Sequence, residues 1–364
     1  MTAYLAVLFI IPIIAILSTA LKNKSARRGI QLIIYFFLLF LVSCLRKDTV
    51  GGDLQRYLPE YADISQSSFI DVLLNGYGDR EWGYVILEKL FSLFLPSQQG
   101  FLIWTSFMFL WLIFRTIKKE SSSIWFSVFI FVASCLFTNS LNIIRASLAT
   151  AIGLYSFKYV KNQEFYKFLL CVIAAFLIQR TALFLLPIYF IWKIKFSNFK
   201  VAILLLTSFI ASRLLSGNAL ISIVNKYLSL YEISDTGYLS NNPSGITPYA
   251  VFLLILLILG ILVYKKGNGY DKNFEFLLYM LAVALSIQFF ASVFSLLNRI
   301  SVFYSSYMLL YLPALVDKFT KESRLPMYII ICSVFTLFFI TSLSIDPVTK
   351  TDTQAIIPYR FFWQ

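Results

Sequence analysis

The 364-residue sequence contains no histidine and only four cysteines. Without histidine, imidazole-ligated haem, His-containing zinc sites and acyl transfer by a histidine base are excluded, so any proton transfer would use Asp, Glu, Lys or Tyr. Cys44, Cys135, Cys171 and Cys332 lie inside apolar runs without metal-ligand spacing, which is typical of small buried side chains. Neither a metal nor another cofactor is expected.

Charged residues are also scarce, at 13%, whereas hydrophobic residues make up 59%. This composition excludes an ordinary soluble domain, and repeated apolar runs of about 20 residues or fewer predict helices that span a lipid bilayer. The formal net charge of +13 would suit a nucleic-acid partner. Lysines at helix ends beside anionic lipid explain the charge better, so no nucleic acid is expected.

The apolar runs predict an all-α integral membrane protein with about twelve spans in a single polytopic domain, residues 1–364. The predicted helices are 3–21, 30–45, 101–117, 124–138, 143–160, 165–178, 181–194, 201–216, 247–264, 274–297, 300–316 and 326–345. This arrangement puts both termini outside and every lysine-rich loop inside. The run 82–96 carries Glu88 and Lys89, so it is predicted as an amphipathic or re-entrant helix on the outer face.

The predicted outer side has two long loops, 46–81 and 217–246, and an aromatic tail, 346–364. Loops of this length in a compact membrane domain are usually functional. Arginine is the main basic residue on this side, at Arg46, Arg56, Arg80, Arg145, Arg180, Arg213, Arg299 and Arg360. Topology does not account for basic residues outside, so we expect some of them to bind a ligand.

Three of these arginines are predicted to lie near the outer ends of helices, each beside an amide side chain. Arg145 follows Asn142 by one helical turn, and Arg180 follows Gln179. Arg299 is the third, and all three are predicted to converge on one anionic cavity. A guanidinium binds phosphate oxygens through two parallel hydrogen bonds, so a lipid phosphate or pyrophosphate is the expected ligand. The alternative for Arg145 is an arginine whose side chain extends to the membrane interface.

The candidate general bases are carboxylates of the first outer loop. Asp53 follows two glycines that allow close backbone approach, and Glu81 directly precedes Trp82. Either could accept the proton of a sugar hydroxyl as it attacks an anomeric carbon. The alternative is a solvated loop with charges of both signs. The candidate saccharide-binding rings on this side are Tyr57, Trp82, Tyr84 and Tyr359.

Four motifs in order resemble those of the EpsG-like, Wzy-type polysaccharide polymerases. Residues 46–57 (RKDTVGGDLQRY) look like the family's R…G-x-D-x-x-x-Y loop, and residues 81–84 (EWGY) like its E-x-G-Y. Residues 142–149 (NIIRASLA) are similar to N-x-x-R-x-x-x-A, and residues 358–361 (PYRF) to the aromatic carboxyl end. The family commonly has a histidine where this chain has Gln179-Arg180, so a histidine-base mechanism does not carry over.

The resemblance implies a metal-independent membrane glycosyltransferase with a GT-C-like architecture. It would join undecaprenyl-pyrophosphate-linked oligosaccharide repeats on the outer face of the bacterial cytoplasmic membrane, moving the growing glycan to the non-reducing end of a new repeat. Arg145, Arg299 and Arg180 would bind pyrophosphate with Arg46 assisting, and a chain-length regulator is a further partner that the resemblance allows. A flippase or exporter of lipid-linked saccharides and a glycan ligase are the alternatives.

Overall fold

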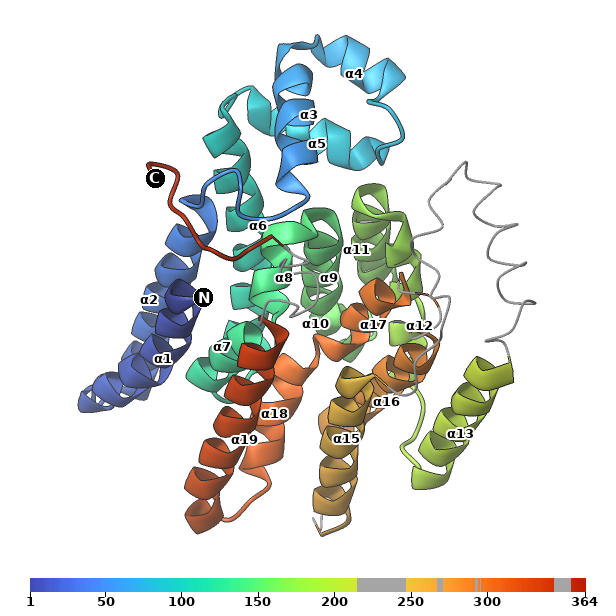
Figure 1. Cartoon of the computed structure of the whole chain (residues 1–364). Coiled ribbons are helices and arrows are strands. Elements are labelled where there is room, and N and C mark those ends of the chain that lie inside the picture. Colours follow the sequence, from blue (N-terminus) through green and yellow to red (C-terminus); the bar gives the residue numbers. More distant parts are fainter. Residues whose placement is uncertain (215–246, 267–270, 292–293, 295, 344–354) are drawn as a thin grey trace. The chain divides into compact units, whose positions relative to one another are not determined.

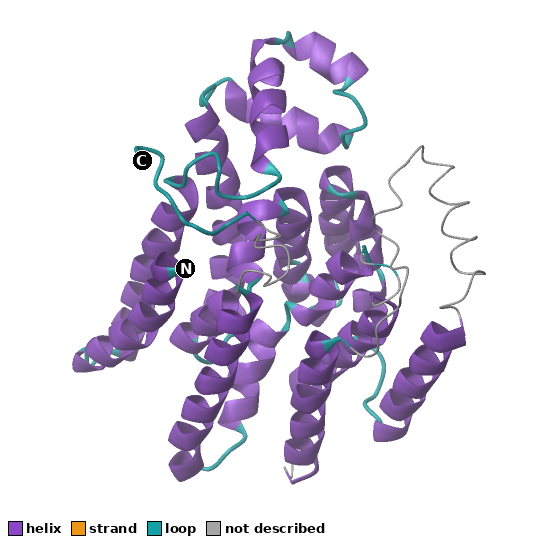
Figure 2. Cartoon of the chain, viewed as in Figure 1, coloured by secondary structure: helices purple, strands orange, loops and turns teal. Residues whose placement is uncertain are grey.

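The computed structural model describes residues 1–214, 247–266, 271–291, 294, 296–343 and 355–364. In these ranges the regular structure is helical and contains no strand, as predicted (Figure 2). The predicted loop 217–246 lies outside them. The contacts divide the chain into two compact units, one of Met1–Leu183 with Leu312–Gln364 and one of Phe184–Tyr311. Each unit is described by itself, and the single domain over 1–364 stays a prediction.

The first unit contains the amino-terminal helices and the carboxyl end (Figure 1). Its helices are α1 (Thr2–Leu17), η1 (Ser18–Ala20), α2 (Lys24–Cys44), α3 (Leu54–Gln66), α4 (Phe69–Asn75), α5 (Trp82–Ser92), α6 (Gln98–Glu120), α7 (Ile124–Ala133), α8 (Leu136–Asn142), α9 (Ile144–Tyr155), α10 (Phe157–Lys161), α11 (Phe165–Ile178) and α19 (Lys321–Ser342). Helix α6 packs against α2 and α9, and α9 also packs against α11. The boundaries between the units fall inside η2 (Arg180–Leu185) and α18 (Met308–Asp317).

The segment predicted as the first outer loop, 46–81, is largely helical. Helix α3 buries one face, formed by Leu54, Tyr57, Leu58, Tyr61 and Ile64, and this helical spacing explains why so charged a segment folds. Lys89 of α5 donates to the carbonyls of residues 64, 65 and 67 at the end of α3. These contacts place a cation on the negative end of that helix and fasten α5 to it.

Helix α5 confirms the predicted short helix at 82–96, but two of its charges are not at the surface. Glu88 and Lys89 are 1% and 4% exposed. The predicted helix 124–138 is broken in the structure, because α7 and α8 are bent by 52° at a break before residue 136. Cys135 at the break has φ 63°, a left-handed conformation that interrupts the helix.

The second unit is built around α16 (Lys272–Ala291). Its other helices are α12 (Pro187–Ile191), α13 (Asn198–Leu214), α15 (Pro248–Lys266) and α17 (Leu297–Ser305). Helix α16 is buried along most of its length and packs against all four. The Tyr264 hydroxyl of α15 donates to the Glu275 carboxylate of α16, which gives this buried acid a polar partner.

Six helices of the described chain are long and apolar enough to cross a membrane, or seven if the bent α7–α8 pair counts as one span. The six are Thr2–Ala20, Lys24–Cys44, Gln98–Glu120, Lys272–Ala291, Leu297–Asp317 and Lys321–Ser342. This number indicates a multi-pass membrane protein. Shorter apolar helices occur at Phe165–Ile178, Arg180–Ile191 and Pro248–Tyr264. The count of twelve spans stays a prediction.

Candidate active site

The carboxyl-terminal segment 355–362 pairs with the segment that follows α2. The Lys47 N–H donates to the Arg360 carbonyl at 2.9 Å, and the Gly51 N–H donates to the Ala355 carbonyl at 2.8 Å. Next to the first of these contacts, Arg46 and Phe361 form an isolated antiparallel bridge. The aromatic tail is therefore part of the framework that holds the 46–53 loop.

The turn of this loop rests on the end of α8. Gly51 has φ 115°, and a Cβ there would collide with the Leu141 carbonyl, so the sequence needs glycine at this position. The Asn142 side-chain oxygen accepts the Asp53 N–H at 2.9 Å. Asn142 thus holds the start of α3 in place, and Asp53, half-buried, stands at the amino end of that helix.

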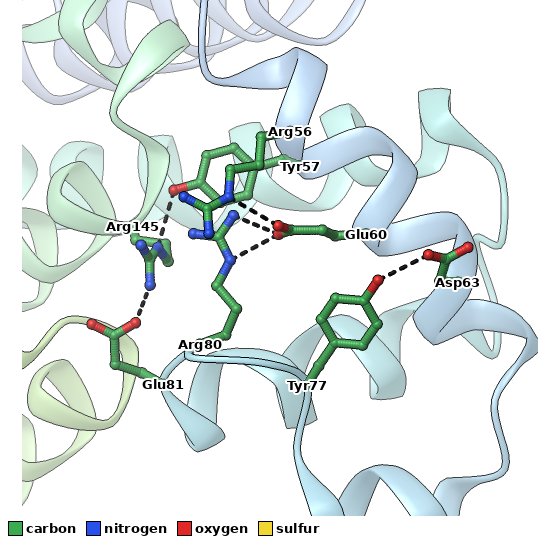
Figure 3. A network of polar contacts seen from close by, with 8 residues as sticks. All are labelled: Arg56, Tyr57, Glu60, Asp63, Tyr77, Arg80, Glu81 and Arg145. Atoms are coloured by element: carbon green, nitrogen blue, oxygen red, sulfur yellow. Dashed lines mark hydrogen bonds and ion pairs between the residues drawn. The ribbon is translucent and has the colours of Figure 1, made fainter. Parts of the chain in front are cut away.

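Arg145, at the start of α9, joins three separate elements (Figure 3). Its Nε donates to the Tyr57 hydroxyl of α3 at 3.0 Å, and its Nη1 forms an ion pair with Glu81, just before α5. The other oxygen of Glu81 accepts the backbone N–H of Arg180 at 3.2 Å. The side chains of Arg145 and Glu81 are 18% and 10% exposed, so water screens this pair weakly.

A second arginine–carboxylate pair lies on the other side of Tyr57. Arg80 donates from Nε to Glu60 at 2.8 Å, and its guanidinium lies over the Tyr57 ring, 4.8 Å from the centroid (Figure 3). The Arg145 guanidinium is 5.9 Å from the same centroid. Tyr57 therefore contacts two cations, one at its hydroxyl and one over its ring.

Glu60 was not predicted as a site residue, and Arg80 was predicted only as one of the arginines on the outer side. The sequence did contain a signal for Glu60, because Tyr57 and Glu60 are three residues apart and therefore face the same side of α3. Glu60 also binds Arg56 at 3.1 Å, but that arginine side chain is 70% exposed. The buried pair with Arg80 is the one that shapes the site.

Beneath Arg145 lies a buried layer formed by α5. The ring of Tyr84, fully buried, has its centroid 5.8 Å from the Arg145 guanidinium. One turn further, Glu88 is also buried and its Oε1 has no hydrogen-bond partner in the described part of the chain. Burial raises the pKa of Glu88 to about 8, so this carboxyl is largely protonated at neutral pH. Burial likewise raises the pKa of Tyr57, and both tyrosines are neutral.

Helix α5 approaches α11 closely through Gly83, where a Cβ would collide with the side chain and carbonyl of Leu177. This approach explains the glycine of the EWGY motif and brings Gln179 and Arg180 to the site. Gln179 ends α11 and is buried, whereas the Arg180 side chain is exposed and contributes its backbone N–H to Glu81. Arg180 thus reaches the Arg145–Glu81 pair through its backbone, and the predicted convergence of its guanidinium with that of Arg145 on one cavity stays a prediction.

Arg299 belongs to the second unit, where it is half-buried in α17. Its neighbour Asn298 accepts a hydrogen bond from Gln288 at 2.8 Å. The predicted convergence of Arg299 on the arginines of the first unit stays a prediction.

The remaining predicted site residues differ in how far their side chains are exposed to solvent. Trp82 is 48% exposed and donates from its indole to the Leu73 carbonyl at 3.0 Å. Tyr359 is half-buried and donates to the Val42 carbonyl at 2.9 Å, and Arg46 is 1% exposed. Tyr57 and Tyr84 are buried, so Trp82 is the ring of this set most open to a saccharide.

No group of three or more Cys, Asp and Glu side chains that could hold a metal ion occurs among the described residues. The site instead combines two partly shielded arginines, their carboxylates and a tyrosine hydroxyl. Such a set can bind an anion of two or more charges through arginine and can accept a proton through a carboxylate.

No curated protein and no solved structure matches this chain. The model of one protein family does match, and the match runs over residues 29–361. It includes all four motifs, the Arg145 network and the carboxyl-terminal segment up to Phe361. Because the match covers nearly the whole sequence, this chain belongs to the EpsG family.

Proposed function

We propose that this EpsG-family polymerase joins oligosaccharide repeats carried on undecaprenyl pyrophosphate, at the outer face of the bacterial cytoplasmic membrane. The growing glycan would leave its lipid pyrophosphate and pass to the non-reducing end of a new repeat. The observation that supports this most is the Arg145 guanidinium, held between the Glu81 carboxylate and the Tyr57 hydroxyl. In this proposal the contact joins the group that binds the anion to a candidate base.

This contact constrains the mechanism. A carboxylate paired with an arginine is a weak proton acceptor, because the pair stabilises its charged form. A pyrophosphate is a stronger competitor for the guanidinium, since it carries more charge and offers paired oxygens. Binding of the lipid-linked donor would therefore take Arg145 away from Glu81 and free the carboxylate near the reacting carbon.

The transfer step then balances without a metal. The acceptor hydroxyl gives its proton to the freed Glu81, and its oxygen forms a bond with the anomeric carbon of the donor. The bond from that carbon to the pyrophosphate oxygen breaks, and the pyrophosphate leaves with the electron pair. Arg145 stabilises the charge that develops on the leaving group. Asp53, held at the start of α3, is the second candidate for the base.

The proposal also includes the arrangement in the membrane and the other residues of the site. Both termini would lie outside in a GT-C-like arrangement of about twelve spans, which keeps the lysine-rich loops cytoplasmic. Arg180, Gln179, Asn142 and Arg299 would complete the pyrophosphate site with Arg46 as indirect support, while Trp82 would stack on a sugar. A chain-length regulator would be an additional partner.

The experiment measures the lipid-linked saccharide pool in cells of the source bacterium that lack this gene. Single repeats that accumulate on the outer face are the expected result, because the repeats would cross the membrane but not be joined. Single repeats confined to the cytoplasmic face would contradict the proposal and indicate a flippase. Finished polymer that stays on its lipid would contradict it too and indicate a ligase.

Complementation assigns the effect to the site. Arg145→Ala should give no polymer at normal protein level, because the pyrophosphate loses its cation. Arg324→Gln removes an arginine that is paired with Asp317 far along the chain, and it should restore normal polymer. Normal chain length with Arg145→Ala would refute the assigned role of Arg145.

A further inference from the structure

Arg46 is the most buried arginine of the first unit and has only neutral partners. Its side chain sits under the 355–362 segment with 1% of the residue exposed. It donates to the carbonyl of Ser43 at 2.5 Å, to the Ser43 hydroxyl at 3.1 Å and to the Leu141 carbonyl at 3.3 Å. Its Nε has no hydrogen-bond partner among the described residues.

Among the described residues, no carboxylate balances the charge of Arg46. Burial lowers the pKa of Arg46 to about 10, which still leaves the guanidinium charged at neutral pH. In the described part of the chain it forms no ion pair with any carboxylate. A buried charge without a counter-charge is costly, so such a group normally pairs with an anion.

A small cavity lies beside this guanidinium, between the end of α2 and helices α6, α8 and α9. Its volume of about 10 Å³ has room for one particle about the size of a water molecule. Five hydroxyl side chains line it together with Arg46: Ser43, Thr105, Ser106, Ser140 and Ser147.

The hydroxyls differ in whether they can donate into the cavity. Those of Thr105 and Ser140 donate to carbonyls of their own helices. The Ser147 hydroxyl makes no hydrogen bond to a described residue, and in the Ser43–Ser106 pair, 2.6 Å apart, one hydroxyl hydrogen remains available. These two hydroxyl groups can donate into the cavity beside the Arg46 guanidinium, an arrangement that suits an anion.

We propose that this cavity binds one small monovalent anion, with chloride as the physiological ion, and that the anion neutralises Arg46. This inference is independent of the proposed function. The bound ion would also support the active site, because Arg46 holds the Leu141 carbonyl and the next residue, Asn142, holds Asp53. Loss of the anion would loosen the joint between α8 and α3 without removing any group that contacts substrate.

The first test measures the apparent unfolding temperature of the purified full chain in detergent. Sodium gluconate is exchanged for sodium chloride at constant ionic strength, and bromide and sulfate are compared in the same way. We expect chloride and bromide to raise the unfolding temperature saturably, by about 2 °C or more, and sulfate to have no such effect because it is too large. Equal unfolding temperatures in chloride and gluconate would mean that the cavity holds only water, which overturns the proposal.

Variants locate the ion. Arg46→Gln should abolish the chloride effect, but it removes three hydrogen bonds and could prevent folding. Ser147→Val is the second variant, because the larger side chain fills the cavity while Arg46 stays in place. Ser134→Ala, at a buried serine that does not line the cavity, serves as the control and should keep the chloride effect. A chloride effect that persists in Ser147→Val would place the ion elsewhere and overturn the proposal.

Bromide gives a direct readout. Crystals of the full chain grown in bromide should show an anomalous peak in the cavity lined by Arg46 and Ser147. A map without a peak at this position would also overturn the proposal.

Discussion

The Arg80 guanidinium lies over the ring of Tyr57 while Arg145 donates to the hydroxyl of the same tyrosine. Each arginine has its own carboxylate, Glu60 for Arg80 and Glu81 for Arg145. Tyr57 is thus the spacer between two ion pairs and limits how closely the two cations approach. The ring of Tyr84 packs edge-on against the ring of Tyr57, with the two centroids 6.0 Å apart, and this contact helps to fix the position of Tyr57.

The first prediction separates the two contacts of Tyr57. Tyr57→Phe removes the hydrogen bond to Arg145 and keeps the ring under Arg80, so polymer formation should slow by about tenfold. Tyr57→Leu removes both contacts and should slow it by about a hundredfold. The rate is measured in proteoliposomes with lipid-linked repeats. Tyr77→Phe, which removes a tyrosine hydroxyl bound to Asp63, is the control and should behave as wild type.

The second prediction concerns the Glu60–Arg80 pair, whose side chains are 17% and 6% exposed. Glu60→Gln leaves the buried Arg80 without a counter-charge and should lower the free energy of unfolding by about 3 kcal/mol. In the double variant with Arg80→Gln, the loss in free energy of unfolding should be smaller than the sum for the two single variants, because neither charge is then buried without its partner. Denaturant unfolding of the four proteins measures this.

Arg56, the other partner of Glu60, provides the control for this double-mutant cycle. Arg56 pairs with Glu60 but its side chain is 70% exposed, so Arg56→Gln should cost less than about 1 kcal/mol. A loss as large as that of Glu60→Gln would show that the cost comes from the lost contact between Glu60 and Arg56 and not from the stranded Arg80.

The sequence predicted the helices where apolar runs are long, as at 30–45 and 101–117, because such runs have few alternatives in a membrane. Arg145 and Glu81 were both predicted as site residues, and this assignment stays a prediction. The sequence did not predict their contact, because that depends on how α3 and α5 fold over the end of α9. The segment 46–81 was predicted as a loop because its charges are conspicuous, although the apolar spacing of α3 was present at residues 54–64.

Arg46 shows another limit of sequence reasoning. An arginine just after a span looks like a group available to substrate, yet here the carboxyl-terminal segment covers it. The covering residues are more than 300 positions away in the sequence, so the local sequence around Arg46 does not indicate that it is buried. Likewise Glu88 and Lys89 look like surface charges, but α3 and α5 bury both of them.

The third prediction tests the turn at Gly51. Gly51→Ala must adopt a positive φ and displace the Leu141 carbonyl, so it should lower the free energy of unfolding by more than about 1 kcal/mol and reduce polymer. Gly29→Ala is the matched control. Gly29 lies in α2 with open space around its Cα, so alanine there should be neutral or stabilising. Equal effects of the two variants would refute the close contact at Gly51.

The fourth prediction follows from the buried carboxyl of Glu88. Its pKa is raised from 4.5 to about 8 by burial, so the folded protein keeps a proton that the unfolded chain releases. Stability should therefore fall as the pH rises from about 4.5 to about 8 and should change no further from this group above that pH. Glu88→Gln should remove this slope in the unfolding temperature, whereas Glu322→Gln, at an exposed position, should keep it. A slope unchanged in Glu88→Gln would contradict the raised pKa.

The fifth prediction distinguishes the two candidate bases. If Glu81 accepts the proton, Glu81→Gln should lower kcat by about 10²–10⁴-fold and remove the acidic limb of the pH–rate profile. Because Glu81 also competes with pyrophosphate for Arg145, the same variant should lower KM for the lipid-linked donor. A fall in kcat together with a fall in KM is not expected from simple loss of structure.

Asp53→Asn keeps the backbone contact with Asn142 and should lower kcat by less than about tenfold if Asp53 is not the base. Glu164→Gln, at a carboxylate paired with Lys167, is the control for charge removal and should leave both constants unchanged. A larger loss in Asp53→Asn than in Glu81→Gln would move the base to Asp53. Glu81 would then be the residue that holds Arg145 until the pyrophosphate arrives, and its replacement would lower KM while leaving the pH–rate profile unchanged.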